Sequence, residues 1–397
     1  MSLSKRVQAI KPSPTLAVSA RAAQLKAEGK DIIALGTGEP DFDTPQHIKD
    51  AAIVAINAGF TKYTAVGGTP SLKKAVIAKF KRDNNLTYTA KQILVSCGGK
   101  QSFFNLSLAV IDPGDEVIIP APYWVSYPDI VIIAEGTPVI VEADIEQGFK
   151  LTAAQLEAAI TPKTKMLVIN SPSNPSGAVY TLEDLKALGE VLRKYPRILI
   201  ATDDMYEHIA LIDGKFVNIL DACPDLYART LMLNGVSKAY AMTGWRIGYA
   251  AGPEEIISAM EKVQSQSTSN PTSISQVAAE AALNGDQNCL APMIKAFRER
   301  HVFVVNELNK IPGLKCLMAG GAFYAFPDAR QAIAALYKKG LIKEANDIAL
   351  SEYLLLEAGV AVVPGSAFGS EGYIRLSFAT SMENLTNALA RMQKALS

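Results

Sequence analysis

The chain has 397 residues, and its 39 lysines and arginines balance its 39 aspartates and glutamates, so the formal net charge is zero. A chain without a basic excess lacks the electrostatic field that holds nucleic acid or an anionic membrane, so neither partner is expected. With 49% hydrophobic and 20% charged residues, the composition is that of a globular protein, and the length favours two domains.

The N-terminal part predicts three helices and one extended segment. The first forty-odd residues contain a helical pattern, Thr15–Ala27, and an extended segment, Ile32–Leu35, which are too short to fold alone and are expected to pack on the C-terminal part. Two further helices open on Thr-Pro pairs and run from residue 45 to 58 and from 70 to 84. A threonine N-cap followed by proline in the first turn is a typical helix start.

Short apolar runs alternate with longer helical patterns in the middle of the chain, and this alternation predicts an α/β domain around a mostly parallel sheet. Several runs are apolar at odd and even positions alike, as strands covered on both faces must be. One intervening helix opens at Thr181 and runs to Lys194. The expected strands are Ile93–Val95, Glu116–Ile119, Pro138–Val141, Met166–Asn170, Ile198–Asp203, Thr230–Asn234 and Ile247–Ala251.

The pattern changes after about residue 285. A long helix passes through Arg298 and Glu307, and short strands follow at Phe323–Phe326, Val360–Val363 and Ile374–Phe378, with helices between them. These elements predict a second, smaller α+β domain. The expected division is a large domain of residues 46–285 and a small domain of residues 1–45 and 286–397.

The four cysteines and three histidines are dispersed along the chain. None forms a Cys-x-x-Cys pair or stands at zinc-ligand spacing, so we expect neither a disulfide framework nor a metal site. The N-terminus lacks the apolar core of a signal peptide, and no apolar run approaches the roughly 20 residues that span a bilayer. The expected location is the cytoplasm.

Ligands of open α/β sheets bind at the carboxyl ends of the strands, so residues that follow strands are the site candidates. The segment from Ser96 to Gln101 follows a strand, opens a helix and contains Gly98 and Gly99. Glycines let the backbone approach an anion, and the free N–H groups of a helix start favour phosphate, although a plain tight turn is the better interpretation of this segment taken alone. No complete dinucleotide fingerprint or P-loop is present, which disfavours a nucleotide-dependent oxidoreductase.

Three further polar residues follow apolar strands. Burial would destabilise the ammonium of Lys238 and make it a nucleophilic amine able to form a Schiff base. Asp203 could hold a proton on a heteroaromatic nitrogen, although a turn or cap role fits two adjacent aspartates as well. Asn174 could hydrogen-bond a ligand hydroxyl, although the Asn-Pro and Ser-Gly pairs around it are also typical of an ordinary turn.

Trp124 and Arg375 complete the set of candidates. Trp124 follows a strand and could stack on a flat cofactor, or it could belong to the core. Arg375 stands between Ile374 and Leu376 on an expected strand, where a guanidinium requires a partner. A carboxylate is the natural partner, from either a substrate or an internal acid.

Taken in chain order, the segments GGKQ, SPSNPSG, DDMYEH, SKAYAMTGWRIGY and IRLSFA resemble the fold-type I pyridoxal-phosphate aminotransferases, specifically the class I, subgroup Ib, aspartate aminotransferases of bacteria. The likeness extends from VQAIKPSPTLAV to VAVVPGSAFG, over nearly the whole chain. It implies a fold-type I transferase fold, the cofactor pyridoxal 5′-phosphate and a homodimer with shared active sites.

The resemblance implies a role for each residue around the cofactor ring. Lys238 would form the Schiff base and move the proton of the substrate's Cα. Asp203 would pair with the pyridinium nitrogen, Tyr206 and Asn174 would hydrogen-bond the phenolic oxygen, and Trp124 would stack on the ring.

It also implies how the cofactor phosphate is held. The backbone at Gly99 and Lys100 would bind it together with the guanidinium of Arg246, and Tyr63 would reach in from the second subunit. The resemblance leaves the role of Ser237 open.

For the substrate, the resemblance implies that Arg375 holds the α-carboxylate beside the backbone of Gly38. Trp124 and Asn174 would also contact the substrate, and Lys100 would meet the distal carboxylate of a dicarboxylic acid. The implied reaction moves the amino group of aspartate or glutamate to 2-oxoglutarate or oxaloacetate by ping-pong kinetics.

The alternative substrates are aromatic amino acids and prephenate. Subgroup members with a KPS-x-T segment, here residues 11–15, and the lysine of GGKQ sometimes accept prephenate. A pyridoxal-phosphate-binding regulator of DNA is disfavoured, because the chain has no excess of positive charge.

Overall fold

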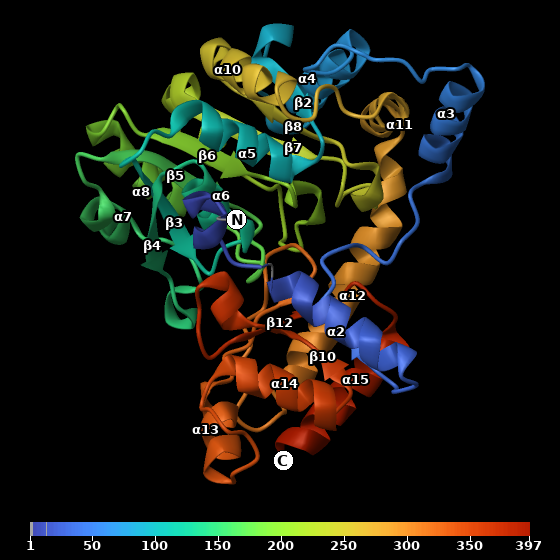
Figure 1. The fold of residues 1–397 in the computed structure, drawn as a ribbon, viewed down its shortest axis with the longest axis vertical. Helices are drawn as coiled ribbons and strands as arrows, with labels where there is room; N and C mark the ends of the chain where they lie inside the picture. The colour runs from blue at the N-terminus through green and yellow to red at the C-terminus, as the bar shows by residue number, and fades with distance from the viewer. Residues whose placement is uncertain (1–2, 13) are drawn as a thin grey trace.

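The computed structural model describes residues 3–12 and 14–397, and its largest element is a seven-stranded sheet (Figure 1). The strand order is β2-β8-β7-β6-β5-β3-β4, and β8 alone runs antiparallel to its neighbours. This mostly parallel sheet confirms the α/β class and every strand predicted between residues 93 and 251. The strands are β2 (Ile93–Ser96), β3 (Glu116–Ala121), β4 (Thr137–Glu142), β5 (Thr164–Asn170), β6 (Leu199–Asp203), β7 (Thr230–Gly235) and β8 (Gly248–Ala251).

Helices cover both faces of this sheet. Alternate residues of each strand face opposite sides, and apolar residues on both sides need helices to bury them. In β5, Leu167 and Ile169 pack with one cluster of buried residues, whereas Met166 and Val168 pack with another. The first cluster includes residues of α3 (Gln46–Asn57), α4 (Pro70–Asn84), α8 (Leu182–Lys194) and α11 (Ser273–Asn284). The second includes residues of α5 (Gly99–Val110), α6 (Ser126–Ile133) and α10 (Glu254–Ser265). Strands apolar at both parities therefore reflect a sheet covered on both faces.

The predicted starts of α4 and α8 are confirmed at atomic detail, whereas the threonine cap predicted for α3 is wrong. The N-cap of α3 is Pro45, and the hydroxyl of Thr44 instead donates a hydrogen bond to the carbonyl oxygen of Ala241 at 2.7 Å. The hydroxyl of Thr69 accepts a hydrogen bond from Leu72 N at 3.3 Å, and Pro70 occupies the first turn of α4. Thr181 caps α8 in the same way and forms a capping box with Asp184. These polar caps satisfy backbone N–H groups that have no partner within the helix.

The C-terminal residues form four helices and two small sheets. The helices are α12 (Ala291–Leu308), α13 (Arg330–Lys338), α14 (Asp347–Glu357) and α15 (Met382–Leu396). One sheet has the order β11-β12-β9, from β11 (Val363–Pro364), β12 (Ile374–Ser377) and β9 (Tyr324–Ala325). The prediction of a single strand at Val360–Val363 is wrong. The chain changes its pairing partner after Ala361, so β10 (Val360–Ala361) and β11 belong to different sheets.

The N-terminal segment joins these C-terminal elements, as predicted. Strand β1 (Ile33–Ala34) pairs parallel with β10, and α2 (Pro14–Ala27) buries Ala22 and Leu25 against Leu355 and Ala361. Figure 1 shows the blue α2 next to β10, among the orange and red C-terminal elements. The division at residues 45/46 and 285/286 stays a prediction.

The N-terminus also contains a short helix that the sequence did not predict, α1 (Lys5–Ala9), which packs on α6. Ser13, part of the KPS-x-T segment, lies outside the described residues. Within residues 3–12 and 14–397, no helix has both the length and the apolar character needed to cross a membrane.

Candidate active site

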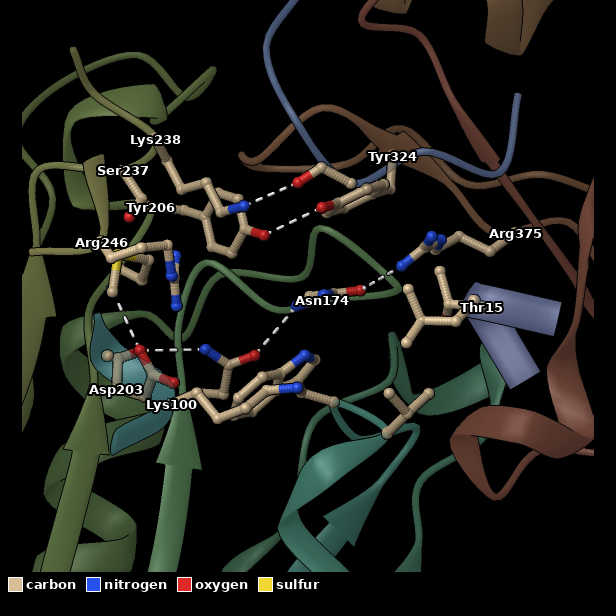
Figure 2. Close-up of a pocket in the computed structure, with 17 residues that line it drawn as sticks. Thr15, Lys100, Asn174, Asp203, Tyr206, Ser237, Lys238, Arg246, Tyr324 and Arg375 are labelled. Carbon is tan, nitrogen blue, oxygen red and sulfur yellow. Dashed lines mark hydrogen bonds between the residues drawn. The ribbon is translucent and has the colours of Figure 1, made fainter. Parts of the chain in front are cut away.

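A cavity of about 280 Å³ lies at the carboxyl ends of β5, β6 and β7, next to β9 and β12 (Figure 2). Ten of the eleven residues predicted for the site line it, although they come from segments as far apart as residues 38 and 375. They are Gly38, Gly99, Lys100, Trp124, Asn174, Asp203, Tyr206, Lys238, Arg246 and Arg375. Ser237, whose role the sequence left open, also lines the cavity.

Tyr63 is the eleventh predicted residue, and it does not line this cavity. It lies in the loop between α3 and α4, and its side chain is 92% exposed. An exposed side chain that does not line the cavity of its own chain is available to a second chain. The predicted role of Tyr63 in a second subunit stays a prediction.

Lys238 follows β7 and points into the cavity (Figure 2). Its Nζ donates a hydrogen bond to the carbonyl oxygen of Gly38 at 2.6 Å. Burial, followed by the positive charges of Arg246 and Arg375, lowers the pKa of Lys238 to about 8. Loss of a proton near neutral pH gives this amine the nucleophilic form that an ordinary lysine rarely takes.

Asp203 ends β6 with its carboxylate directed into the cavity (Figure 2). Its Oδ2 accepts a hydrogen bond from the hydroxyl of Tyr127 at 2.6 Å, and its Oδ1 accepts one from Met205 N at 3.2 Å. Burial raises the pKa of Asp203, and the Tyr127 hydrogen bond and the charge of Lys238 offset part of this rise. A protonated heteroaromatic nitrogen beside Oδ1 or Oδ2 would stabilise the charged carboxylate.

Tyr127 is a site residue that sequence analysis missed. It lies in α6, three residues after Trp124, and it is 1% exposed. The sequence holds no signal for it, because the hydrogen bond to Asp203 joins residues 76 positions apart.

We expect Tyr127→Phe to lower kcat/KM by about tenfold, because hydrogen bonds to charged groups contribute about 1.5–3 kcal/mol and this one holds the carboxylate of Asp203. Steady-state kinetics on the purified variant measure the effect. Tyr123→Phe is the matched control, since it removes a neighbouring hydroxyl that does not contribute to the hydrogen bonds of Asp203. Equal kinetics for the two variants would contradict the role of Tyr127.

Tyr206 and Tyr324 form a second polar pair in the cavity. Their hydroxyl oxygens lie 2.9 Å apart, and burial raises the pKa of both phenols. Nζ of Lys238 lies 6.0 Å from the centre of the Tyr206 ring. Tyr324 comes from the short strand β9, and sequence analysis did not predict it as a site residue.

Arg375 is 2% exposed, and its guanidinium is held on several sides. Nη1 donates to Asn174 Oδ1 at 3.0 Å and Nη2 donates to the carbonyl oxygen of Gly36 at 2.7 Å. The guanidinium carbon lies 4.6 Å from the ring centre of Tyr324 and 4.9 Å from that of Phe368. The aromatic rings therefore fix the plane of the guanidinium.

No carboxylate pairs with Arg375 within the part of the chain that the structure describes, and its buried Nε has no hydrogen-bond partner there. The sequence left two partners open, an internal acid and a substrate. A buried cation without an internal counter-ion, next to a cavity, fits a carboxylate ligand.

The start of α5 forms an anion cradle with Arg246. Gly98 has a φ of 90°, a backbone conformation that L side chains rarely adopt, so this turn requires glycine, and the guanidinium of Arg246 lies directly against it. No side chain caps the first N–H groups of α5, which therefore remain available to an anion. Together with the guanidinium of Arg246, they make a site suited to a phosphate group.

Lys100 is the second residue of α5, and its Nζ lies 5.3 Å from the ring centre of Trp124. Partial burial and the nearby charge of Arg246 lower the pKa of Lys100. The cavity thus contains two anion sites, one at Arg246 and one at Arg375, with the amine of Lys238 and the acid of Asp203 beside them.

Comparison with known proteins agrees with this arrangement. Residues 30–392 match the family "Aminotransferase class I and II". The chain is 70% identical to an aspartate/prephenate aminotransferase of Nitrosomonas europaea over 100% of both chains, and 55% identical to one of Cereibacter sphaeroides over 98% of both.

Solved structures show the same likeness. The aspartate aminotransferase of Rhizobium meliloti has a TM-score of 0.94 at 51% identity, covering 100% of this chain and 99% of that one. The aspartate aminotransferase of Thermus thermophilus with maleate has a TM-score of 0.93 at 44% identity, covering 100% of both chains. The chain therefore belongs to the class I and II aminotransferase family, and it is an enzyme that transfers amino groups.

Proposed function

We propose that this aminotransferase uses pyridoxal 5′-phosphate and moves the amino group of L-aspartate or L-glutamate to 2-oxoglutarate or oxaloacetate. The observation that carries the proposal is the pairing, in one cavity, of an amine with a lowered pKa, Lys238, and a buried guanidinium, Arg375, for which the described residues supply no carboxylate partner. The first suits a lysine that reacts with an aldehyde, and the second suits the α-carboxylate of an amino acid.

The residues of the cavity fit the cofactor group by group. The cradle of Gly98, Gly99 and Arg246 would hold its phosphate, and Asp203 would hold the proton on its ring nitrogen. Tyr206 and Asn174 offer hydrogen bonds to its phenolic oxygen. Trp124, which is partly buried at the cavity wall, offers a flat face for stacking.

When bound, pyridoxal phosphate supplies an aldehyde carbon for the amino group and an electron-withdrawing ring. Arg375 binds the α-carboxylate of the substrate and so orients the bond between Cα and its hydrogen. With its amine neutral, Lys238 would take the proton from Cα of the substrate. It would then deliver this proton to the aldehyde carbon of the cofactor. Asp203 keeps the ring nitrogen protonated during this transfer. Amino donor and oxo acceptor use the same cavity in turn, which makes the kinetics ping-pong.

The second candidate substrate class is aromatic amino acids with prephenate as acceptor. Several relatives carry the name aspartate/prephenate aminotransferase, including the one that is 70% identical. Thr15 of the KPS-x-T segment lines the cavity together with Leu16. The N-terminal segment thus contributes an apolar side chain where a larger substrate would extend.

We expect Lys100→Ala to lower kcat/KM for aspartate and 2-oxoglutarate by about tenfold, because it removes a charged partner of the distal carboxylate. Activity with monocarboxylic substrates such as phenylalanine is expected to stay within about twofold. Comparison of kcat/KM across the two substrate classes measures the difference. Equal losses of kcat/KM for dicarboxylic and monocarboxylic substrates would contradict a role of Lys100 in substrate specificity.

The lowered pKa of Lys238 also predicts how stability depends on pH in the cofactor-free protein. The pKa is about 8 in the folded chain against an ordinary value of 10.5, so between these pH values the unfolded chain binds the proton more strongly. The free energy of unfolding therefore rises with pH from about 8 to 10.5, by about 3 kcal/mol from this group.

Denaturant unfolding of the wild type and of Lys238→Met across this pH range tests the prediction. The variant lacks the titrating group, so the difference between the two proteins isolates the contribution of Lys238. A difference that does not change with pH would contradict the burial of a titrating amine at this position.

We further propose that the enzyme is a cytoplasmic homodimer. Tyr63 is exposed and does not line the cavity of its own chain, and the preceding helix α3 exposes Ile53, Val54 and Ile56 to 51%, 66% and 52%. Exposed apolar residues on one helix favour contact with a second chain. Mixing two inactive variants, Tyr63→Ala and Lys238→Ala, tests sharing of the active sites, because mixed dimers would regain one complete site.

The proposed function is tested by the visible absorption spectrum of the purified protein. We expect a band from bound cofactor that disappears on addition of aspartate alone and returns on addition of 2-oxoglutarate. Lys238→Ala is the control. A wild type without such a band, or with a band that no amino acid changes, would contradict the proposal.

A further inference from the structure

A buried ion pair lies directly behind the cavity and takes no part in the chemistry proposed above. Lys79 of α4 is 0% exposed, and its Nζ donates hydrogen bonds to Glu207 Oε1 and, at 2.8 Å, to Asn84 Oδ1. Asn84 Nδ2 donates to Glu207 Oε2 at 2.8 Å. Burial alone would raise the pKa of Glu207, but the charges of Lys79 and His208 outweigh it and lower this pKa.

This pair is connected to the loop that carries Lys238. Asn234 Nδ2 donates to Glu207 Oε1 at 2.6 Å, and Asn234 Oδ1 accepts a hydrogen bond from Gly235 N at 2.7 Å. Asn234 is 1% exposed and ends the apolar part of β7, four residues before Lys238. The carboxamide therefore joins the carboxylate of Glu207 to the backbone at the start of the lysine loop.

The same carboxylate belongs to the loop on the other side of the cavity. Glu207 directly follows Tyr206, and its backbone N–H donates to the carbonyl oxygen of Asp204 at 3.0 Å. Since strands β6 and β7 are neighbours, the loops after them meet at one edge of the sheet. Glu207 thus contacts both loops that carry the proposed acid and base.

A metal site and a purely stabilising ion pair both fit these contacts less well. Asp83, Glu207 and His208 place three ligand atoms within 4.8 Å of one another, as a metal site would, but the ammonium of Lys79 already supplies the positive charge there. A role in stability alone is also weak, because a buried ion pair contributes little net stability compared with well-packed apolar residues. What the charged pair adds is a fixed direction for the carboxamide of Asn234.

We propose that Glu207, held by Lys79, is a positioning residue that acts through Asn234 to fix the loop of Lys238 in its reactive place. This inference rests on the proposed role of Lys238. Under this proposal, the rate of proton transfer also depends on Lys79, Glu207 and Asn234, which do not contact substrate or cofactor. A misplacement of about 1 Å at a reacting group can cost about 100-fold in rate, so a rigid anchor behind the lysine loop has a kinetic effect.

The test compares two asparagines that each donate one hydrogen bond to Glu207. Asn234→Ala breaks the connection to the lysine loop, whereas Asn84→Ala, the matched control, removes the partner on α4 and leaves that connection intact. Both variants are measured as holoenzyme for kcat, for KM, for the pH midpoint of the cofactor's visible band and for melting temperature.

We expect Asn234→Ala to lower kcat by about tenfold with KM for the amino acid within about twofold, and to shift the pH midpoint by about half a unit. Asn84→Ala should lower the melting temperature to a similar degree while kcat and the pH midpoint stay near those of the wild type. Equal effects of the two variants on kcat and on the midpoint would overturn the inference.

A double variant, Lys79→Met with Glu207→Leu, keeps the test decisive if Asn234→Ala does not fold. It replaces both charges by apolar side chains of similar size, which preserves packing and leaves no unpaired charge. We expect it to fold and to lose kcat as Asn234→Ala does. Wild-type kcat in the double variant would overturn the inference, whereas failure of the proposed function would appear in the wild type itself.

Discussion

Lys238→Ala is expected to lower the rate of transamination by at least about 10⁴-fold, because one side chain is proposed both to bind the cofactor covalently and to move the proton. Among the described residues that line the cavity, the other lysine is Lys100, and its amine lies against Trp124 at the start of α5. Single-turnover measurements with aspartate, followed by the change in visible absorption, give the rate directly.

The control for this variant is Lys100→Ala, which removes a second amine from the same cavity. It should keep an absorption band that responds to amino acids, whereas Lys238→Ala should not. Circular dichroism and the melting temperature show that each variant is folded. A Lys238→Ala protein that keeps a tenth or more of the wild-type rate would contradict the assignment of the catalytic base.

Arg375→Ala is expected to lower kcat/KM by about 100- to 1,000-fold for every amino acid and oxo acid. Truncating a buried, hydrogen-bonded charge costs about 2–5 kcal/mol, and here the partner lost is the substrate's carboxylate. The change also leaves Oδ1 of Asn174 without its donor from Nη1. Kinetics with amines that lack the carboxylate provide the internal control, because their rates should not change.

Arg375→Lys tests the geometry of the same contact. The variant keeps the charge, but lysine lacks the planar fork that contacts the rings of Tyr324 and Phe368. We expect a loss of at least about tenfold in kcat/KM. Full activity in this variant would mean that charge alone, without the bidentate geometry, holds the substrate.

Much of the fold could be predicted from the sequence, because burial on two faces leaves a direct pattern in it. Strand β5 reads as a continuous apolar run, and its residues alternate between two clusters of the core. The small sheets were harder to predict. The run from Val360 to Val363 has the composition of one strand, and only tertiary contacts divide it between a parallel pair with β1 and an antiparallel pair with β12.

Site residues could be predicted only where they follow a strand or lie in a motif that resembles the aminotransferases. Each motif alone left two roles open, as Arg375 did between binding an internal acid and binding a substrate. Tyr127 and Tyr324 carried no signal, and Glu207, although it lies in the segment DDMYEH, carried no signal of its role. The importance of these residues comes from contacts with residues 76, 118 and 128 positions away. Such contacts exist only once the sheet has brought the loops together.

Reduction with borohydride shows whether Lys238 is the lysine that binds pyridoxal phosphate. The reagent converts the link between cofactor and lysine into a stable bond, and digestion with mass spectrometry then locates the label. We expect one phosphopyridoxyl group per chain, on the peptide that contains Lys238. A label on Lys100 or on any other lysine, or no label on any peptide, would contradict it.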